Sequence, residues 1–121
     1  MSKRILLVED QPDNRQIIRD LLAVTDYELT EAENGEQALA AVAKQRPDLI
    51  LMDIQLPIMD GYEATRRIKA DPALRSIPII AVTSYALSGE EQKARAAGCD
   101  GYVTKPYSPR LLLARIREFL P

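Results

Sequence analysis

Side chains able to do chemistry follow short aliphatic runs throughout this 121-residue sequence. In chain order they are Glu9, Asp10, Asp53, Thr83, Ser84 and Lys105. Carboxylates brought close together repel one another unless a cation lies between them. A site built only from oxygen ligands favours a hard cation such as Mg²⁺. If these residues converge, the sequence predicts a magnesium site at which a carboxylate can act.

Asp53 is the candidate nucleophile, because a carboxylate can accept a phosphoryl group and form an aspartyl phosphate. Thr83 could donate a hydrogen bond to a phosphoryl oxygen, and Lys105 could supply positive charge from another side. The chain contains no histidine. Acid–base chemistry would therefore fall to carboxylates, hydroxyls, lysines or backbone groups.

Composition excludes several other classes of site. Cys99 is the only cysteine, so an internal disulfide is impossible and the usual zinc sites lack ligands. The net charge is −2 without a dense basic cluster, so we expect no surface for nucleic acid or anionic membranes. The apolar run near the N-terminus stops at Glu9, and no run reaches the roughly 20 residues of a membrane span. We expect a cytoplasmic protein.

Hydrophobic periodicity predicts the elements that would position these residues. Five apolar runs of strand length lie at residues 5–8, 27–32, 49–52, 79–82 and 102–103. Segments with helical spacing alternate with them. Their start signals are Pro12, Asn34, Asp60, Ser88 and the pair Ser108-Pro109.

Five β–α units in succession predict a doubly wound α/β domain spanning residues 1–121. The five strands should form one parallel sheet with helices on both faces and right-handed crossovers. Ligands of such sheets bind beyond the carboxyl ends of the strands. The candidate residues should therefore converge there.

With these residues in place, the chain resembles the response-regulator receiver domains of two-component signalling, which have the flavodoxin-like fold. The resemblance extends from residue 1 to about residue 119. Its motifs are Glu9-Asp10, Asp53, "LPIMDGYE", Thr83-Ser84 and Lys105-Pro106 with Tyr102. It includes stand-alone chemotaxis-type regulators and, through "MDIQLPIMDGYEATRRI", the receivers of hybrid kinases.

The resemblance implies a role for each site residue. Asp53 would be the phosphoacceptor, with Thr83 and Lys105 on the phosphoryl group. Mg²⁺ would be held by Asp10, Asp53, the backbone carbonyl of Ile54 and, through water, Glu9. Thr83 and Tyr102 would form the switch, Gln55 and Tyr85 would tune phosphate lifetime, and the Lys105–Pro106 bond would be cis.

The resemblance also implies partners. A histidine kinase or histidine phosphotransfer protein would supply the phosphoryl group, and a downstream protein would recognise a surface formed by residues 88–98, 101–104 and 109–119. The protein would bind neither nucleic acid nor membrane and would be a monomer or weak dimer. It would not be an enzyme, beyond promoting its own phosphorylation and dephosphorylation.

Two alternatives stay open. The chain could be a receiver cut from a longer protein; a first strand directly after Met1 favours a natural start, whereas Pro121 could be an artificial end. It could also be a Mg²⁺-dependent phosphohydrolase, although such enzymes usually carry a second Asp where this chain has Gln55. Tyr102 could be an ordinary strand aromatic.

Overall fold

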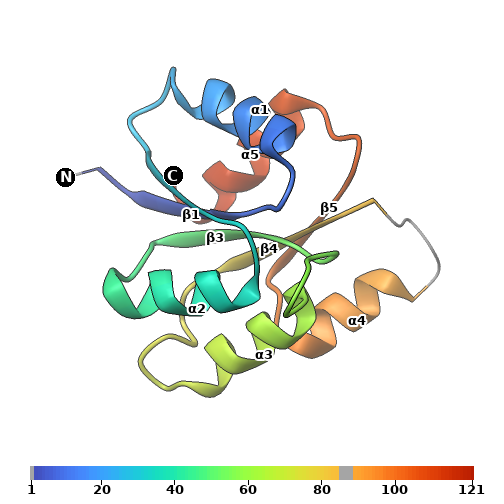
Figure 1. The fold of residues 1–121 in the computed structure, drawn as a ribbon. Helices are drawn as coiled ribbons and strands as arrows, with labels where there is room; N and C mark the ends of the chain where they lie inside the picture. The colour runs from blue at the N-terminus through green and yellow to red at the C-terminus, as the bar shows by residue number, and fades with distance from the viewer. Residues whose placement is uncertain (1, 85–88) are drawn as a thin grey trace.

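The computed structural model describes residues 2–84 and 89–121, which form a single sheet flanked by helices (Figure 1). The strands are β1 (Arg4–Val8), β2 (Glu28–Ala32), β3 (Leu49–Asp53), β4 (Ile79–Thr83) and β5 (Gly101–Thr104). The helices are α1 (Pro12–Leu22), α2 (Gly35–Lys44), α3 (Gly61–Ala70), α4 (Glu90–Ala97) and α5 (Pro109–Phe119). Each predicted strand is present.

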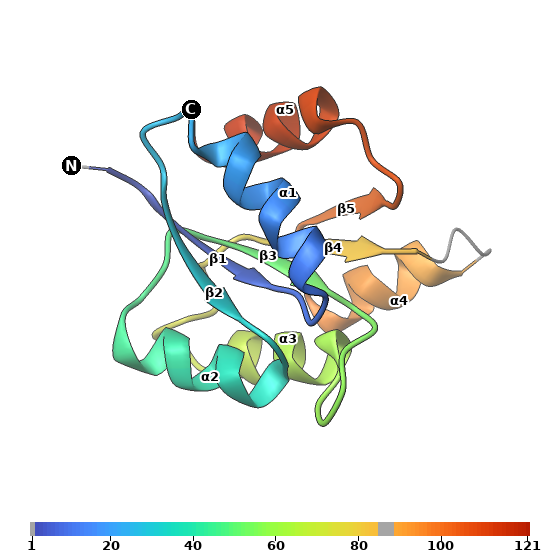
Figure 2. The same ribbon diagram turned by 45° about the horizontal axis from the view of Figure 1, so that its top comes forward.

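All strand pairs are parallel, and the order across the sheet is β2-β1-β3-β4-β5. Helices α1 and α5 cover one face, and α2, α3 and α4 cover the other (Figures 1 and 2). The predicted doubly wound, flavodoxin-like arrangement is confirmed. Strand order reverses between β1 and β3, so the carboxyl ends of these two strands border the crevice in which such sheets bind ligands.

The central strand β3 is buried over its whole length, which explains its unbroken aliphatic sequence. Successive side chains of a strand point to opposite faces. Ile50 and Met52 accordingly pack with the core beneath α2, α3 and α4, whereas Leu49 and Leu51 pack with the core beneath α1 and α5. Asp53 ends this strand and is held by a rigid, doubly covered support.

Helix starts follow the predicted capping signals in three of the helices. The side chains of Asn34 and Asp60 accept hydrogen bonds from the backbone N–H three residues on, each at 2.9 Å. Ser108 makes the equivalent bond at 3.4 Å. The predicted cap at Ser88 is wrong, because α4 begins at Glu90 with Gly89 in the N-cap position. Ser88 itself lies outside the described residues. The left-handed φ of 94° at Gly89 suits glycine, which lacks a Cβ.

Within the described part of the chain, none of the helices has the length and apolar character needed to cross a membrane.

Candidate functional site

The candidate residues meet at the carboxyl ends of β1, β3, β4 and β5. They do so because the sheet is parallel and these strands are consecutive neighbours. The backbone N–H of Lys105 donates to the carbonyl of Thr83 at 2.7 Å, which ties the end of β5 to the end of β4. Ile54 N–H donates to the carbonyl of Val82 at 3.1 Å and ties β3 to β4 in the same way.

Glu9 and Asp10 follow β1 and differ in burial. Glu9 is 4% exposed, and its carboxylate accepts the backbone N–H of Gln11 at 3.1 Å. Its carbonyl accepts a bond from Arg15 of α1 at 3.0 Å, which fixes the turn between β1 and that helix. Asp10 is half-buried and accepts a bond from the Gln11 side chain at 3.3 Å. Glu9 is therefore held inside the site, and Asp10 lies at its mouth.

Asp53 is 4% exposed at the end of β3. One carboxylate oxygen accepts the backbone N–H of Gln55 at 3.1 Å, and the other accepts Lys105 Nζ at 3.1 Å. The chain returns so close to the Asp53 backbone that position 61 requires glycine, because a Cβ there would lie 2.3 Å from the Asp53 carbonyl oxygen. The loop after β3 thus folds back closely onto the strand end that carries Asp53.

Lys105 joins two of the carboxylates. Its ammonium group lies 2.8 Å from Glu9 Oε1 and 3.1 Å from Asp53 Oδ2. The Lys105–Pro106 peptide bond is cis, the isomer implied by the resemblance. A single ammonium group therefore offsets part of the negative charge of three carboxylates, those of Glu9, Asp10 and Asp53.

Burial and the negative charge of Glu9 raise the pKa of Asp53 to about 6, although Lys105 opposes this effect. Burial would also raise the pKa of Glu9, but the bonds from Lys105 and Gln11 outweigh it and leave that pKa lowered. Burial would lower the pKa of Lys105, but Glu9 and Asp53 outweigh it and raise it. Glu9 and Lys105 therefore form an ion pair. Of the three residues Glu9, Asp53 and Lys105, Asp53 carries the charge that is least well compensated.

The donor set fits Mg²⁺. Glu9, Asp10 and Asp53 each offer a carboxylate oxygen, and these oxygens lie within 4.8 Å of one another. Three carboxylates beside one ammonium leave two negative charges uncompensated when all are ionised, a charge that a divalent cation balances. The ligands are hard oxygens of the kind that Mg²⁺ prefers.

The predicted backbone ligand at Ile54 does not fit. Its carbonyl oxygen accepts hydrogen bonds from the N–H groups of Leu56, at 3.1 Å, and Gly61, at 3.0 Å. These two bonds use both of its lone pairs. Within residues 2–84 and 89–121, no backbone hydrogen bond reaches the carbonyl of Gln55, which is the next one along the chain.

Thr83 is fully buried at the end of β4 and contacts the Gln55 side chain. Its hydroxyl oxygen lies 3.0 Å from Gln55 Nε2 and 3.2 Å from Gln55 Oε1. The backbone N–H of Ser84 donates to Gln55 Oε1 at 3.4 Å. Sequence reasoning placed Gln55 near the site but missed this contact, because residues 55 and 83 are 28 positions apart.

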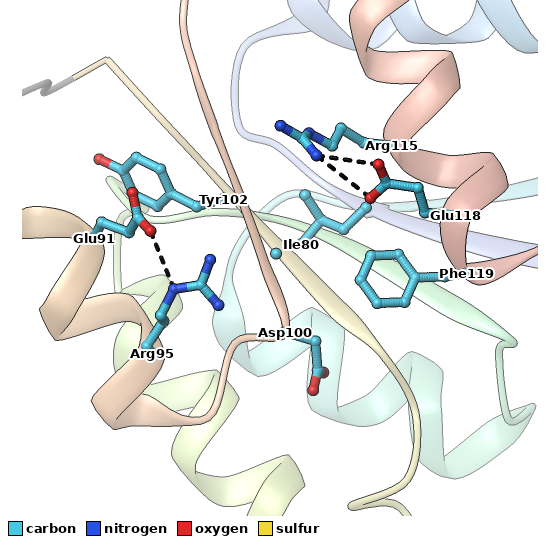
Figure 3. A pocket seen from close by; sticks show the side chains of 9 residues that line it. Ile80, Glu91, Arg95, Asp100, Tyr102, Arg115, Glu118 and Phe119 are labelled. Atoms are coloured by element: carbon cyan, nitrogen blue, oxygen red, sulfur yellow. Dashed lines mark hydrogen bonds and ion pairs between the residues drawn. The ribbon is translucent and has the colours of Figure 1, made fainter.

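Tyr102 lies on β5, half-buried and turned toward α4 (Figure 3). It packs against the core beneath α2, α3 and α4 and is not part of the carboxylate cluster. Tyr85 lies outside the described residues. A second tyrosine was missed: the Tyr62 hydroxyl, at the start of α3, donates to Glu90 at the start of α4 at 2.6 Å. No local sequence signal could have paired them.

Comparison with known proteins agrees with this geometry. The family model described as "Response regulator receiver domain" matches residues 5–117. The polar-differentiation response regulator DivK of Brucella anthropi is 43% identical over 120 residues, which cover 99% of this chain and 98% of that protein.

Two solved structures share the fold. The receiver domain of a Pseudomonas aeruginosa sensor histidine kinase, solved with a magnesium ion coordinated in its active-site cleft, is 39% identical. Its TM-score is 0.91, with 99% of this chain and 98% of that one covered. The chemotaxis response regulator CheY4 of Vibrio cholerae is 28% identical with a TM-score of 0.92, covering 98% and 99% of the two chains.

Proposed function

The chain belongs to the response regulator receiver family, whose members are signalling proteins, and on that premise we propose that it accepts a phosphoryl group on Asp53. Receiver domains are phosphorylated by histidine kinases and act on downstream partners. The donor proposed here is such a kinase or a histidine phosphotransfer protein. The proposed receiver domain spans residues 1–121.

One observation carries the proposal: Asp53 is a buried carboxylate whose second oxygen is bonded to Lys105 between two further acidic side chains. A carboxylate that only ended a strand would be solvated. Attack by an Asp53 oxygen on the phosphorus atom of a phosphohistidine forms a P–O bond and breaks the P–N bond, and the electron pair of that bond returns to the imidazole nitrogen.

Asp10 and Asp53 would hold Mg²⁺ directly, with Glu9 acting through water. The proposed backbone ligand is the carbonyl of Gln55, in place of Ile54. When bound, the ion supplies positive charge that screens the nucleophile from the incoming phosphoryl group and balances the product.

The side chains of the chain itself supply the rest of the site. Lys105 already lies on Asp53 and would compensate a phosphoryl oxygen on that side. Thr83 would donate its hydroxyl proton to another phosphoryl oxygen. Because Thr83 is the last residue of β4 and pairs with Thr104 of β5, a shift of Thr83 toward phosphate would move the end of β4 beside β5.

The proposed output surface comprises α4, β5 and α5. It contains a pocket of about 240 Å³ with Tyr102 at one side and Phe119 at the other (Figure 3). Two ion pairs, Glu91–Arg95 and Arg115–Glu118, border it. Tyr102, which is the proposed switch aromatic, therefore lies where a change in its position alters the surface offered to a downstream protein.

The test is mass measurement after incubation with acetyl phosphate and Mg²⁺. We expect wild type to gain one phosphoryl group and Asp53→Asn to gain none. Asp60→Asn is the matched control, because asparagine keeps the helix cap while making the same chemical change seven residues away. No gain by wild type, or an equal gain by Asp53→Asn, refutes the proposal. Repeated turnover of a small phosphate ester would favour a phosphohydrolase instead.

A further inference from the structure

The Gln55 side chain accepts hydrogen bonds from donors that a phosphoryl group on Asp53 would need. Its side-chain oxygen accepts the N–H of Ser84 at 3.4 Å and lies 3.2 Å from the Thr83 hydroxyl oxygen. Both donors lie at the carboxyl end of β4, beside the end of β3 that carries Asp53. Gln55 Nε2 lies 3.0 Å from the same hydroxyl oxygen, so both ends of the amide contact Thr83 and its oxygen also accepts the Ser84 N–H.

The Ser84 bond decides how the amide is oriented. Only the amide oxygen can accept a backbone N–H, so this bond turns Oε1 toward β4. The Thr83 hydroxyl can then donate to the same oxygen. The backbone N–H of Gln55 is itself bonded to Asp53 at 3.1 Å, which holds the residue over the site.

We propose that Gln55 is a positioning residue whose amide oxygen stands in for a phosphoryl oxygen while Asp53 is unphosphorylated. The inference rests on the proposed function and deepens it. A hydroxyl has a single proton to donate. Thr83 must therefore release Gln55 before it can donate to a phosphoryl group, and Gln55 restrains the switch.

This role differs from shielding the phosphoryl group from water. A shield acts on the phosphorylated protein and alters the rate of phosphate loss. A competing acceptor acts on the unphosphorylated protein and weakens its affinity for any phosphoryl-like ligand. The two are separated by equilibrium binding of an analogue that cannot hydrolyse.

The experiment is calorimetric titration with beryllofluoride, a phosphoryl analogue that bonds to a carboxylate oxygen, at saturating Mg²⁺. Gln55→Met keeps the length of the side chain but removes its acceptor, and Gln55→Asn keeps the amide but is one methylene shorter. Both should bind roughly three- to tenfold more tightly than wild type, the range expected when one competing hydrogen bond is lost. Gln45→Met, at an exposed position after α2, is the matched control and should bind like wild type.

A spectroscopic signature excludes a merely structural effect. In the unliganded variants, the NMR signals of the Thr83 methyl and the Ser84 amide should move toward their positions in beryllofluoride-bound wild type. Equal or weaker binding by the Gln55 variants, or unmoved signals, overturns the inference while the proposed function stands. If wild type does not bind the analogue in an Asp53-dependent manner, the proposed function fails and the inference falls with it.

Discussion

Removal of the carboxylate at Asp53 should stabilise the metal-free protein. The pKa of Asp53 rises from an ordinary 3.8 to about 6 on folding. The folded state therefore holds a proton that the unfolded chain releases, and stability falls as pH rises between these two values. At pH 7.5 the ionised carboxylate destabilises the fold by about 3 kcal/mol, since each pKa unit corresponds to about 1.4 kcal/mol.

The Asp53→Asn variant escapes this cost, which already includes the opposing effect of Lys105, but its amide replaces the protonated acid imperfectly at the 3.1 Å contact with Lys105. We therefore expect it to be more stable than wild type by about 1 to 3 kcal/mol at pH 7.5 in EDTA. The difference should fall to about half at pH 5 and disappear near pH 3, where Asp53 is protonated in both states. Saturating Mg²⁺ should narrow the difference by stabilising wild type more.

The assay is urea unfolding followed by circular dichroism, at pH 7.5 and pH 5, with EDTA and with Mg²⁺. Asp60→Asn removes the same charge from an exposed position and should change stability little. An Asp53→Asn variant that is less stable than wild type at pH 7.5, or a difference that does not shrink at pH 5, would refute the reasoning.

Three further changes test the packing around the site. A Cβ on Gly61 would lie 2.3 Å from the Asp53 carbonyl oxygen, so Gly61→Ala should lower the free energy of unfolding by about 2 kcal/mol or more. A Cβ on Gly89 meets no described residue within 4 Å, so Gly89→Ala should cost only the strain of φ +94°, about 1 kcal/mol in urea unfolding; equal losses for the two variants would contradict the contact. Ile58 is 75% exposed with φ 69°, a poor conformation for a β-branched residue, so Ile58→Asn should raise the free energy of unfolding by about 0.5 to 1 kcal/mol. Burial raises the pKa of the Cys99 thiol, so it should resist a disulfide reagent at pH 8 until urea unfolds the protein, and rapid labelling of the native protein would count against that burial.

Two kinds of error in the sequence predictions have physical causes. The start of α4 was placed one residue too early, because Ser88 and Gly89 are both acceptable caps and side-chain chemistry alone does not choose between them. The backbone ligand was placed at Ile54 because the side chains say nothing about where a loop carbonyl points. That direction depends on the return of the chain to Gly61.

The sequence alone determined the sheet and the strand ends. Unbroken aliphatic runs of strand length, such as residues 49–52, indicate strands covered on both faces, and polar residues follow where burial ends. The sequence therefore identifies Glu9, Asp53 and Thr83 as strand-end residues. Hydrophobic periodicity depends only on residues that are close together in the sequence, so strands and helices can be recognised without the tertiary structure.

Only the tertiary structure decided which of these residues touch. Strand order brought Lys105 to both Glu9 and Asp53, and the close approach of β3 and β4 placed the Gln55 amide on Thr83. Such contacts join residues up to 96 positions apart. Their geometry depends on how the whole sheet twists and packs, so no local pattern records them.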